Sequence, residues 1–127
     1  MTERRILLVE DDEDIAGAMA AILEEEGYCV VHASDGEEAL RVLREGLSPR
    51  LIVLDLFIPG MSGIEFRRVQ RTDPTITDIP VIVVSGVSDM LKDIQAMGVA
   101  RCFRKPVDVP ALLGAVTELS SGTKAVD

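Results

Sequence analysis

The sequence is poor in the residues that define several common protein classes. Its two cysteines, Cys29 and Cys102, form no C-x-x-C motif, so neither a disulfide framework nor a zinc site is indicated, and a reducing cytoplasm fits best. His32 is the only histidine, which excludes metal sites built from several histidines. No apolar run approaches the roughly 20 residues that cross a bilayer. We therefore expect neither a membrane segment nor a signal peptide.

Basic residues are also in the minority. The chain has 13 Lys and Arg against 22 Asp and Glu, which gives a formal net charge of -9. This balance disfavours direct binding to nucleic acid or to acidic membranes, whose phosphates attract cationic surfaces. Neither G-x-x-x-x-G-K-[ST] nor G-x-G-x-x-G occurs, so these motifs give no support for nucleotide binding.

What is present is a regular alternation of short apolar runs with longer amphipathic segments, which is typical of a parallel sheet covered by helices on both faces. The length of 127 residues suits one domain, which we place at residues 1–119, followed by a loose polar tail at 120–127. The predicted fold is a doubly wound α/β domain with five parallel strands in the order 2-1-3-4-5 and five helices. The apolar runs are Ile6 to Val9, Tyr28 to Val31, Leu51 to Leu54, Val81 to Val84 and, weakest, Cys102 with Phe103.

Helix starts and stops can be read from capping residues and glycines. The first helix ends before Gly27 and the fourth near Gly98. The second helix is expected to begin with a capping box of Ser34 and Glu37 and to end near Gly46. The third is expected to begin with a capping box of Ser62 and Glu65 and to run to about Arg71. We expect Asp108 to cap the fifth helix.

Reactive side chains follow the predicted strands. Glu10 and Asp11 close the first run, Asp55 the third and Ser85 the fourth, while the fifth leads into Lys105. The carboxyl ends of parallel strands meet at one edge of the sheet, where ligands bind in open α/β folds. Carboxylates about 4 Å apart repel by roughly 4 kcal/mol per pair at an effective dielectric of 20, so the cluster needs a cation. Oxygen ligands favour magnesium, beside which a carboxylate can attack phosphorus.

Some of these residues, and other charged residues of the chain, also have a plainer interpretation. Asp12 is expected to be the cap of the first helix, and Asp11 taken alone would be a favourable charge near the helix start. Ser85 could begin a loop and Lys105 could be a solvated cation. The arginines Arg67, Arg68 and Arg71 are expected to form a solvated helix face.

Together, the motifs resemble those of a two-component response-regulator receiver domain. They are Leu7-Leu8-Val9-Glu10-Asp11-Asp12, Leu54-Asp55 with Pro59 and Gly63 in the frame Asp-x-x-x-Pro-x-x-x-Gly, Val83-Val84-Ser85-Gly86 and Lys105-Pro106. The resemblance covers the chain from Arg5 to about Leu119.

The resemblance implies a flavodoxin-like receiver fold and a signalling role without turnover of an external substrate. Asp55 would accept a phosphoryl group from the phosphohistidine of a sensor histidine kinase or phosphotransfer protein. Glu10, Asp11, Asp55 and the backbone carbonyl of Phe57 would hold Mg2+, while Ser85 and Lys105 would bind phosphoryl oxygens. It also implies a cis peptide bond before Pro106 and signalling to an output protein or domain through the fourth helix, fifth strand and fifth helix.

The chain departs from the family pattern at three places. Members usually carry an aromatic residue three positions before the lysine, where this chain has Cys102, so the usual coupling of hydroxyl and ring is in doubt. Phe103 should point to the opposite face of the strand and so cannot replace that ring. Phe57 and Val87 are apolar near the site, and we expect them to impede the hydrolytic water and lengthen the phosphorylated lifetime.

The last predicted helix is uncharged from Val109 to Val116, and its small residues Ala111, Gly114 and Ala115 favour a partner surface or a homodimer contact. Among other functions, a haloacid-dehalogenase-like magnesium phosphatase is the leading enzyme alternative, but it needs a second acid where this chain has Phe57. A flavodoxin-like binder would need phosphate-binding hydroxyls and glycines after the first strand, where acidic residues stand instead.

Overall fold

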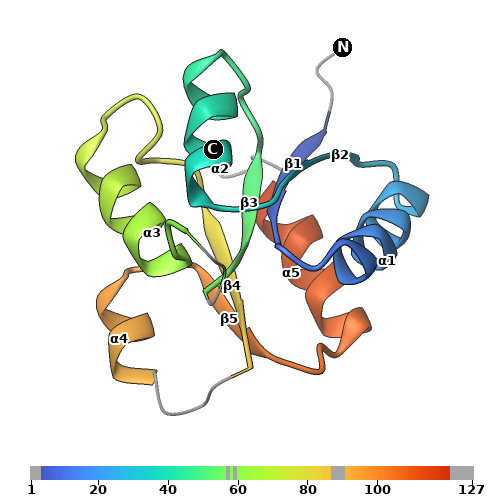
Figure 1. Ribbon diagram of the computed structural model, residues 1–127. Helices are drawn as coiled ribbons and strands as arrows, with labels where there is room; N and C mark the ends of the chain where they lie inside the picture. Colours follow the sequence, from blue (N-terminus) through green and yellow to red (C-terminus); the bar gives the residue numbers. More distant parts are fainter. Residues whose placement is uncertain (1–3, 57, 59, 87–90, 121–127) are drawn as a thin grey trace.

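Five strands and five helices alternate along the chain in the computed structural model (Figure 1). The structure describes residues 4–56, 58, 60–86 and 91–120, and of residues 91–93 only the backbone. The elements are β1 (Arg5–Val9), α1 (Glu13–Glu25), β2 (Cys29–Ala33), α2 (Gly36–Arg44), β3 (Leu51–Asp55), α3 (Gly63–Thr72), β4 (Val81–Ser85), α4 (Leu91–Ala96), β5 (Arg101–Arg104) and α5 (Val109–Ser120).

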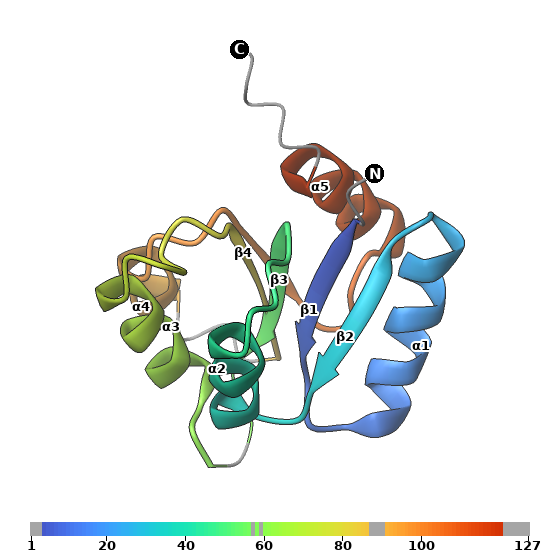
Figure 2. The same ribbon diagram turned by 90° about the horizontal axis from the view of Figure 1, so that it is seen from above.

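The strands form one parallel sheet in the order β2-β1-β3-β4-β5, which confirms the predicted topology. Figure 2 shows α1 and α5 on one face of this sheet and α2, α3 and α4 on the other. Because all strands run the same way, their carboxyl ends lie at a single edge of the sheet. The loops that follow β1, β3, β4 and β5 are therefore neighbours at that edge.

Alternating residues of each central strand serve two separate cores. In β1, Ile6 and Leu8 pack with α1 and α5, whereas Leu7 and Val9 pack with α2, α3 and α4. In β3, Leu51 and Val53 belong to the first group and Ile52 and Leu54 to the second. Burial on both faces explains why these strands are continuous apolar runs rather than alternating ones.

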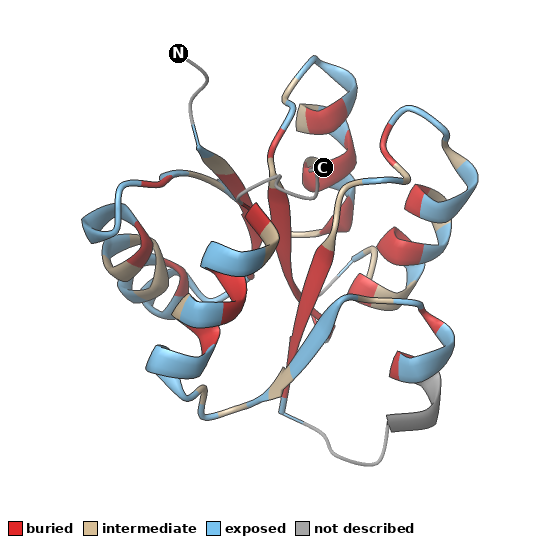
Figure 3. Ribbon diagram, turned by 180° about the vertical axis from the view of Figure 1, so that it is seen from behind, coloured by how far each residue is buried: buried red, intermediate tan, exposed pale blue. Residues whose placement is uncertain are grey.

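β5 differs because it is an edge strand. Every residue of β3 and β4 is buried, whereas β5 is exposed except for the half-buried Phe103 (Figure 3). Phe103 packs with the α1 and α5 core, and the neighbouring Cys102 is exposed. The apolar run of this strand is weak in the sequence because the strand lies at the edge of the sheet. Phe103 and Cys102 point to opposite faces of the strand, as expected.

Side chains cap the helices at most of the predicted places. Asp12 accepts hydrogen bonds from the backbone N–H groups of Asp14 and Ile15, and Ser62 and Glu65 form a capping box. The Asp108 carboxylate likewise accepts a bond from a backbone N–H of α5.

The predicted box of Ser34 and Glu37 is wrong by one residue. Asp35 caps α2 and accepts from the backbone N–H of Glu38, whose side chain in turn accepts from the N–H of Ser34. A Cβ on Gly36 would lie 2.8 Å from the Met61 carbonyl oxygen, so Gly36 packs where no side chain fits and begins the helix.

The last helix runs one residue further than expected. Ser120 is the final residue of α5, is buried, and donates a hydrogen bond to the Tyr28 hydroxyl at 3.1 Å. It belongs to the folded part of the chain rather than to the tail that we placed at 120–127. The rest of that tail, 121–127, lies outside the described residues. None of the helices in the described ranges has the length and apolar composition of a membrane-spanning segment.

Candidate functional site

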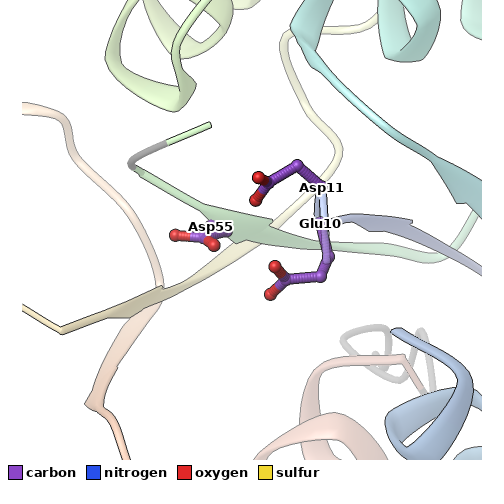
Figure 4. Close-up of side chains that lie close together, drawn as sticks. All are labelled: Glu10, Asp11 and Asp55. Carbon is purple, nitrogen blue, oxygen red and sulfur yellow. The ribbon is translucent and has the colours of Figure 1, made fainter. Parts of the chain in front are cut away.

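Three carboxylates meet at the carboxyl edge of the sheet. Glu10 and Asp11 directly follow β1, and Asp55 is the last residue of the neighbouring β3. One oxygen from each side chain lies within 4.8 Å of the other two (Figure 4). Glu10 and Asp55 are 3 % and 5 % exposed, whereas Asp11 is exposed. Two of the three charges therefore require compensation inside the protein.

Lys105 supplies part of that compensation from the far end of the sheet. Its Nζ atom lies 3.0 Å from Asp55 Oδ2 and 3.4 Å from Glu10 Oε1. The Lys105 side chain is 29 % exposed, so one side of the ammonium group still reaches solvent. The geometry brings together the four predicted side chains Glu10, Asp11, Asp55 and Lys105.

The ionisation of the site follows from burial and charge. Burial raises the pKa of Glu10; the N–H of Asp12 and the Lys105 ammonium oppose this, and the nearby Asp55 carboxylate adds to it. Burial alone would lower the pKa of Lys105, but its hydrogen bond and charge interaction with Asp55, joined by Glu10, raise it above its ordinary value. The lysine is thus held as a cation, while Glu10 is less stable as an anion than in water.

Strand alternation explains why these side chains converge. Glu10 comes two residues after Leu8, Asp55 two after Val53 and Lys105 two after Phe103, and those three apolar residues all pack on the α1 and α5 face. Glu10, Asp55 and Lys105 continue the same alternation, and the ion pairs of Lys105 with both carboxylates join them.

Ser85 ends β4 between Asp55 and Lys105. It is buried at 1 % exposure, its carbonyl oxygen accepts a hydrogen bond from the Lys105 backbone N–H at 2.9 Å, and its strand neighbour Val84 is paired with Asp55. The Lys105-Pro106 peptide bond is cis, as expected.

The backbone around Asp55 is closely packed against α3. A Cβ on Gly63 would lie 2.5 Å from the Asp55 carbonyl oxygen and 2.8 Å from Leu56 Cα. The Gly63 N–H donates to the Leu56 carbonyl at 3.1 Å. The first residue of α3 therefore fixes where the end of β3 lies.

An apolar groove of about 590 Å3 borders the charged cluster. It runs between α1 and the segment from Lys105 to Leu112, with Lys105 at its charged end. Ile15 and Val109 line it and are the two exposed large hydrophobic residues among those the structure describes.

Other sequence expectations have mixed outcomes. His32 lies exposed on the edge strand β2 as expected, and its Nε2 donates to the Glu10 carbonyl at 2.6 Å. Ala115 is buried in the core, so it cannot line the surface proposed for α5, whereas Ala111 and Gly114 are exposed. Phe57 and Val87 lie outside the described residues.

The expected solvated arginine face is wrong for Arg67. This side chain is buried, and its guanidinium donates to the Met97 and Gly98 carbonyls, both at 2.9 Å. An amphipathic pattern within one helix predicts that every charged side chain faces solvent. The Met97 and Gly98 carbonyls, however, come just after the end of α4, where carbonyl groups have no partner within the helix and need other hydrogen-bond donors. The signal that was missed is a cationic residue on a helix beside another helix's end.

Comparison with known proteins identifies many similar chains. A family model described as "Response regulator receiver domain" matches residues 6–117. The DNA-binding response regulator MtrA of Mycolicibacterium smegmatis is 38% identical over 86 residues, which are 68% of this chain and 36% of that protein. The CAI-1 autoinducer sensor kinase/phosphatase CqsS of Vibrio cholerae is 34% identical over 117 residues, 90% of this chain and 17% of that protein. The chain thus spans about a third or less of these relatives.

Solved structures agree with the fold. The signal receiver domain of a histidine kinase from Syntrophus aciditrophicus has a TM-score of 0.88 and 33% identity, covering 97% of this chain and 94% of that one. The response regulator protein TrrA from Thermotoga maritima, in complex with Mg2+ and BeF, has a TM-score of 0.82 and 30% identity, covering 91% of this chain and 98% of that one.

Proposed function

Since this chain belongs to the response regulator receiver domain family of two-component systems, we propose that it is a switch in which Asp55 accepts a phosphoryl group from a phosphohistidine. The donor is a sensor histidine kinase or a phosphotransfer protein. The observation that carries the proposal is the contact of Lys105 with Asp55 at 3.0 Å, beside two further carboxylates. A phosphatase of the haloacid-dehalogenase type has no support from the comparisons.

The donor set fits magnesium. Glu10, Asp11 and Asp55 offer only oxygen ligands, which magnesium prefers, and the exposed Asp11 leaves room for the water ligands that this ion retains. We propose these three carboxylates as ligands, together with the Phe57 backbone carbonyl expected from the family resemblance. When bound, the ion neutralises negative charge on phosphoryl oxygens.

The chain's own residues carry the transfer. An Asp55 carboxylate oxygen attacks phosphorus, forming an O–P bond as the N–P bond of the phosphohistidine breaks; the leaving imidazole nitrogen keeps the bonding electron pair. Lys105 is already held as a cation against Asp55 and stabilises a phosphoryl oxygen as charge accumulates there. The Ser85 hydroxyl binds a second oxygen. The hydrogen bond from the Lys105 backbone N–H to the Ser85 carbonyl holds the two residues side by side.

The test is intact-protein mass after incubation with acetyl phosphate, with and without magnesium. Wild type is expected to gain one phosphoryl group only with magnesium, and Asp55→Asn to gain none. Asp78→Asn removes an exposed carboxylate that precedes β4, at the edge of the sheet opposite the site, and should behave as wild type. A gain that persists in Asp55→Asn, or none in any sample, contradicts the proposal.

The output runs through protein contacts. We propose that phosphorylation changes the surface of α4, β5 and α5 and so controls an output protein or domain or a homodimer. Phe103 packs against the core and Cys102 stands where the family usually has an aromatic ring, so we propose that the change does not use an aromatic side chain of β5. Sedimentation with and without a phosphoryl analogue tests the dimer, which is rejected if the chain stays monomeric in both.

Two further proposals come from the sequence. We expect Phe57 and Val87 to slow loss of the phosphoryl group, and a fast loss that Phe57→Asn leaves unaltered would contradict this. The unpaired thiols of Cys29 and Cys102 agree with the cytoplasmic location that we propose.

A further inference from the structure

A second concave site lies between α3 and α4, away from the carboxylate cluster. These helices lie side by side on one face of the sheet (Figures 1 and 2). The cleft between them measures about 570 Å3, within the usual size range of small-molecule sites. Three arginines of α3, Arg67, Arg68 and Arg71, line the cleft together with Thr72. The apolar side chains around them are Ile64, Ala96 and Met97.

Two of the arginines are fixed in position before any ligand arrives. Arg67 is 8 % exposed; besides its bonds to the Met97 and Gly98 carbonyls, it donates to the Gln70 side chain at 2.7 Å. Arg71 donates to the Ala96 carbonyl at 2.8 Å. Each guanidinium group has five N–H groups, so Arg67 and Arg71 both keep N–H donors that can bind a ligand. Little side-chain entropy would be lost when a ligand binds them.

Among the side chains that the structure describes, no carboxylate pairs with the arginines of this cleft. Arg68 is exposed, and its side chain forms no hydrogen bond with a described residue. Burial lowers the pKa of Arg67, and the charge of the neighbouring Arg71 lowers it further. Three cations converge in this way although the chain as a whole carries a net charge of -9.

We propose that this cleft binds a small molecule bearing phosphate groups. Guanidinium groups match phosphate oxygens in bidentate geometry, and three together suit a compact ligand with more than one negative charge. Arg67 lies deep and is reached from a concave surface, which favours a small ligand over a flat protein face. The apolar wall of Ile64 and Met97 accepts an uncharged part of the ligand. The phosphates are held by side chains, so no glycine-rich loop is required.

The experiment is an NMR titration of the full chain with inorganic pyrophosphate and, separately, with adenosine triphosphate, both without magnesium. We expect saturable shifts at the backbone amides of Arg68, Arg71 and Thr72. If adenosine triphosphate binds more tightly than pyrophosphate, the apolar wall contributes to the affinity. If the two bind equally, the phosphate groups alone account for binding. Shifts confined to Lys105 and its neighbours, or no saturation at 10 mM ligand, which is roughly the weakest affinity of interest, overturn the proposal.

Charge-matched variants distinguish binding at this cleft from nonspecific electrostatic attraction between the ligand and the protein. Arg68→Gln with Arg71→Gln is expected to weaken binding at least about tenfold, because two charge-assisted contacts are lost. Arg41→Gln with Arg44→Gln removes the same charge from exposed positions on α2 and should leave the affinity unchanged. If the first pair unfolds the chain, Arg68→Gln alone removes no hydrogen bond to a described residue and must still weaken binding. Equal losses in both pairs, or equally tight binding of citrate, contradict a phosphate site.

Discussion

Replacing Gly63 by alanine tests how tightly the end of β3 is fixed. Gly63 is the first residue of α3, and its Cβ position lies 2.5 Å from the Asp55 carbonyl oxygen. An ordinary Cβ contact begins at 3.4 Å, and both close neighbours are backbone atoms that no side-chain rotation can move. The added methyl group must therefore displace the end of β3, the start of α3, or both.

The expected loss can be bounded from the two opposing effects. Overpacking against closely packed neighbours costs about 1–3 kcal/mol, and occasionally more. Alanine gains at most about 1 kcal/mol over glycine from helix propensity, and less in the first helical position. We expect Gly63→Ala to lower the free energy of unfolding by about 1–3 kcal/mol. It should also slow phosphorylation of Asp55, since the displaced backbone carries the proposed acceptor.

Gly17 provides the control of opposite sign. It lies within α1, is exposed, and a Cβ there would meet nothing within 4 Å. Gly17→Ala should raise the free energy of unfolding by about 0.5–1 kcal/mol and leave phosphorylation unchanged. Urea unfolding and the acetyl phosphate assay measure both quantities. A Gly63→Ala protein as stable as Gly17→Ala, with normal phosphorylation, would refute the reasoning.

Three other substitutions probe single interactions. Asp12→Ala removes a cap that serves two backbone N–H groups and should cost about 1 kcal/mol in urea unfolding, whereas Asp12→Asn should cost much less. Because burial raises the pKa of Glu10, its charged form weakens the magnesium-free fold as pH rises through that pKa. Glu10→Gln should thus be more stable than wild type at pH 7 and lose this advantage below the usual carboxylate pKa; unfolding curves across pH check it, and a constant difference would contradict it. Tyr28→Phe leaves the buried hydroxyl of Ser120 without its partner and should cost about 1–2 kcal/mol by thermal unfolding, unlike the exposed control Cys29→Ser.

The central fold was predictable because burial on both faces makes β1, β3 and β4 unmistakable apolar runs. The meeting of Glu10, Asp55 and Lys105 was predictable from strand order, since the carboxyl ends of parallel strands share one edge, and strand alternation places the three side chains on the same face. What sequence reasoning missed depends on contacts between distant segments. The α2 cap was misplaced because two adjacent residues, Ser34 and Asp35, are both good caps, and contact with the loop before α3 selects between them.

Arg67 was missed for the same physical reason. Helical spacing describes only which face of α3 a residue occupies, and a cation on that face is normally solvated. The carbonyl groups that Arg67 binds come from residues 30 and 31 positions later in the chain. No pattern within α3 encodes the need of another helix's end for hydrogen-bond donors.

Because Glu10, Asp55 and Lys105 share one alternation, the site depends on the exact number of residues in each strand as well as on the residue types. Inserting one residue into β1 would turn Glu10 toward the α2, α3 and α4 core and bury a carboxylate among apolar side chains. A designer who moves this site to another parallel sheet must therefore keep each charged residue two positions beyond an inward apolar one on the same face. A change of length within the strands that carry the site would break this alternation.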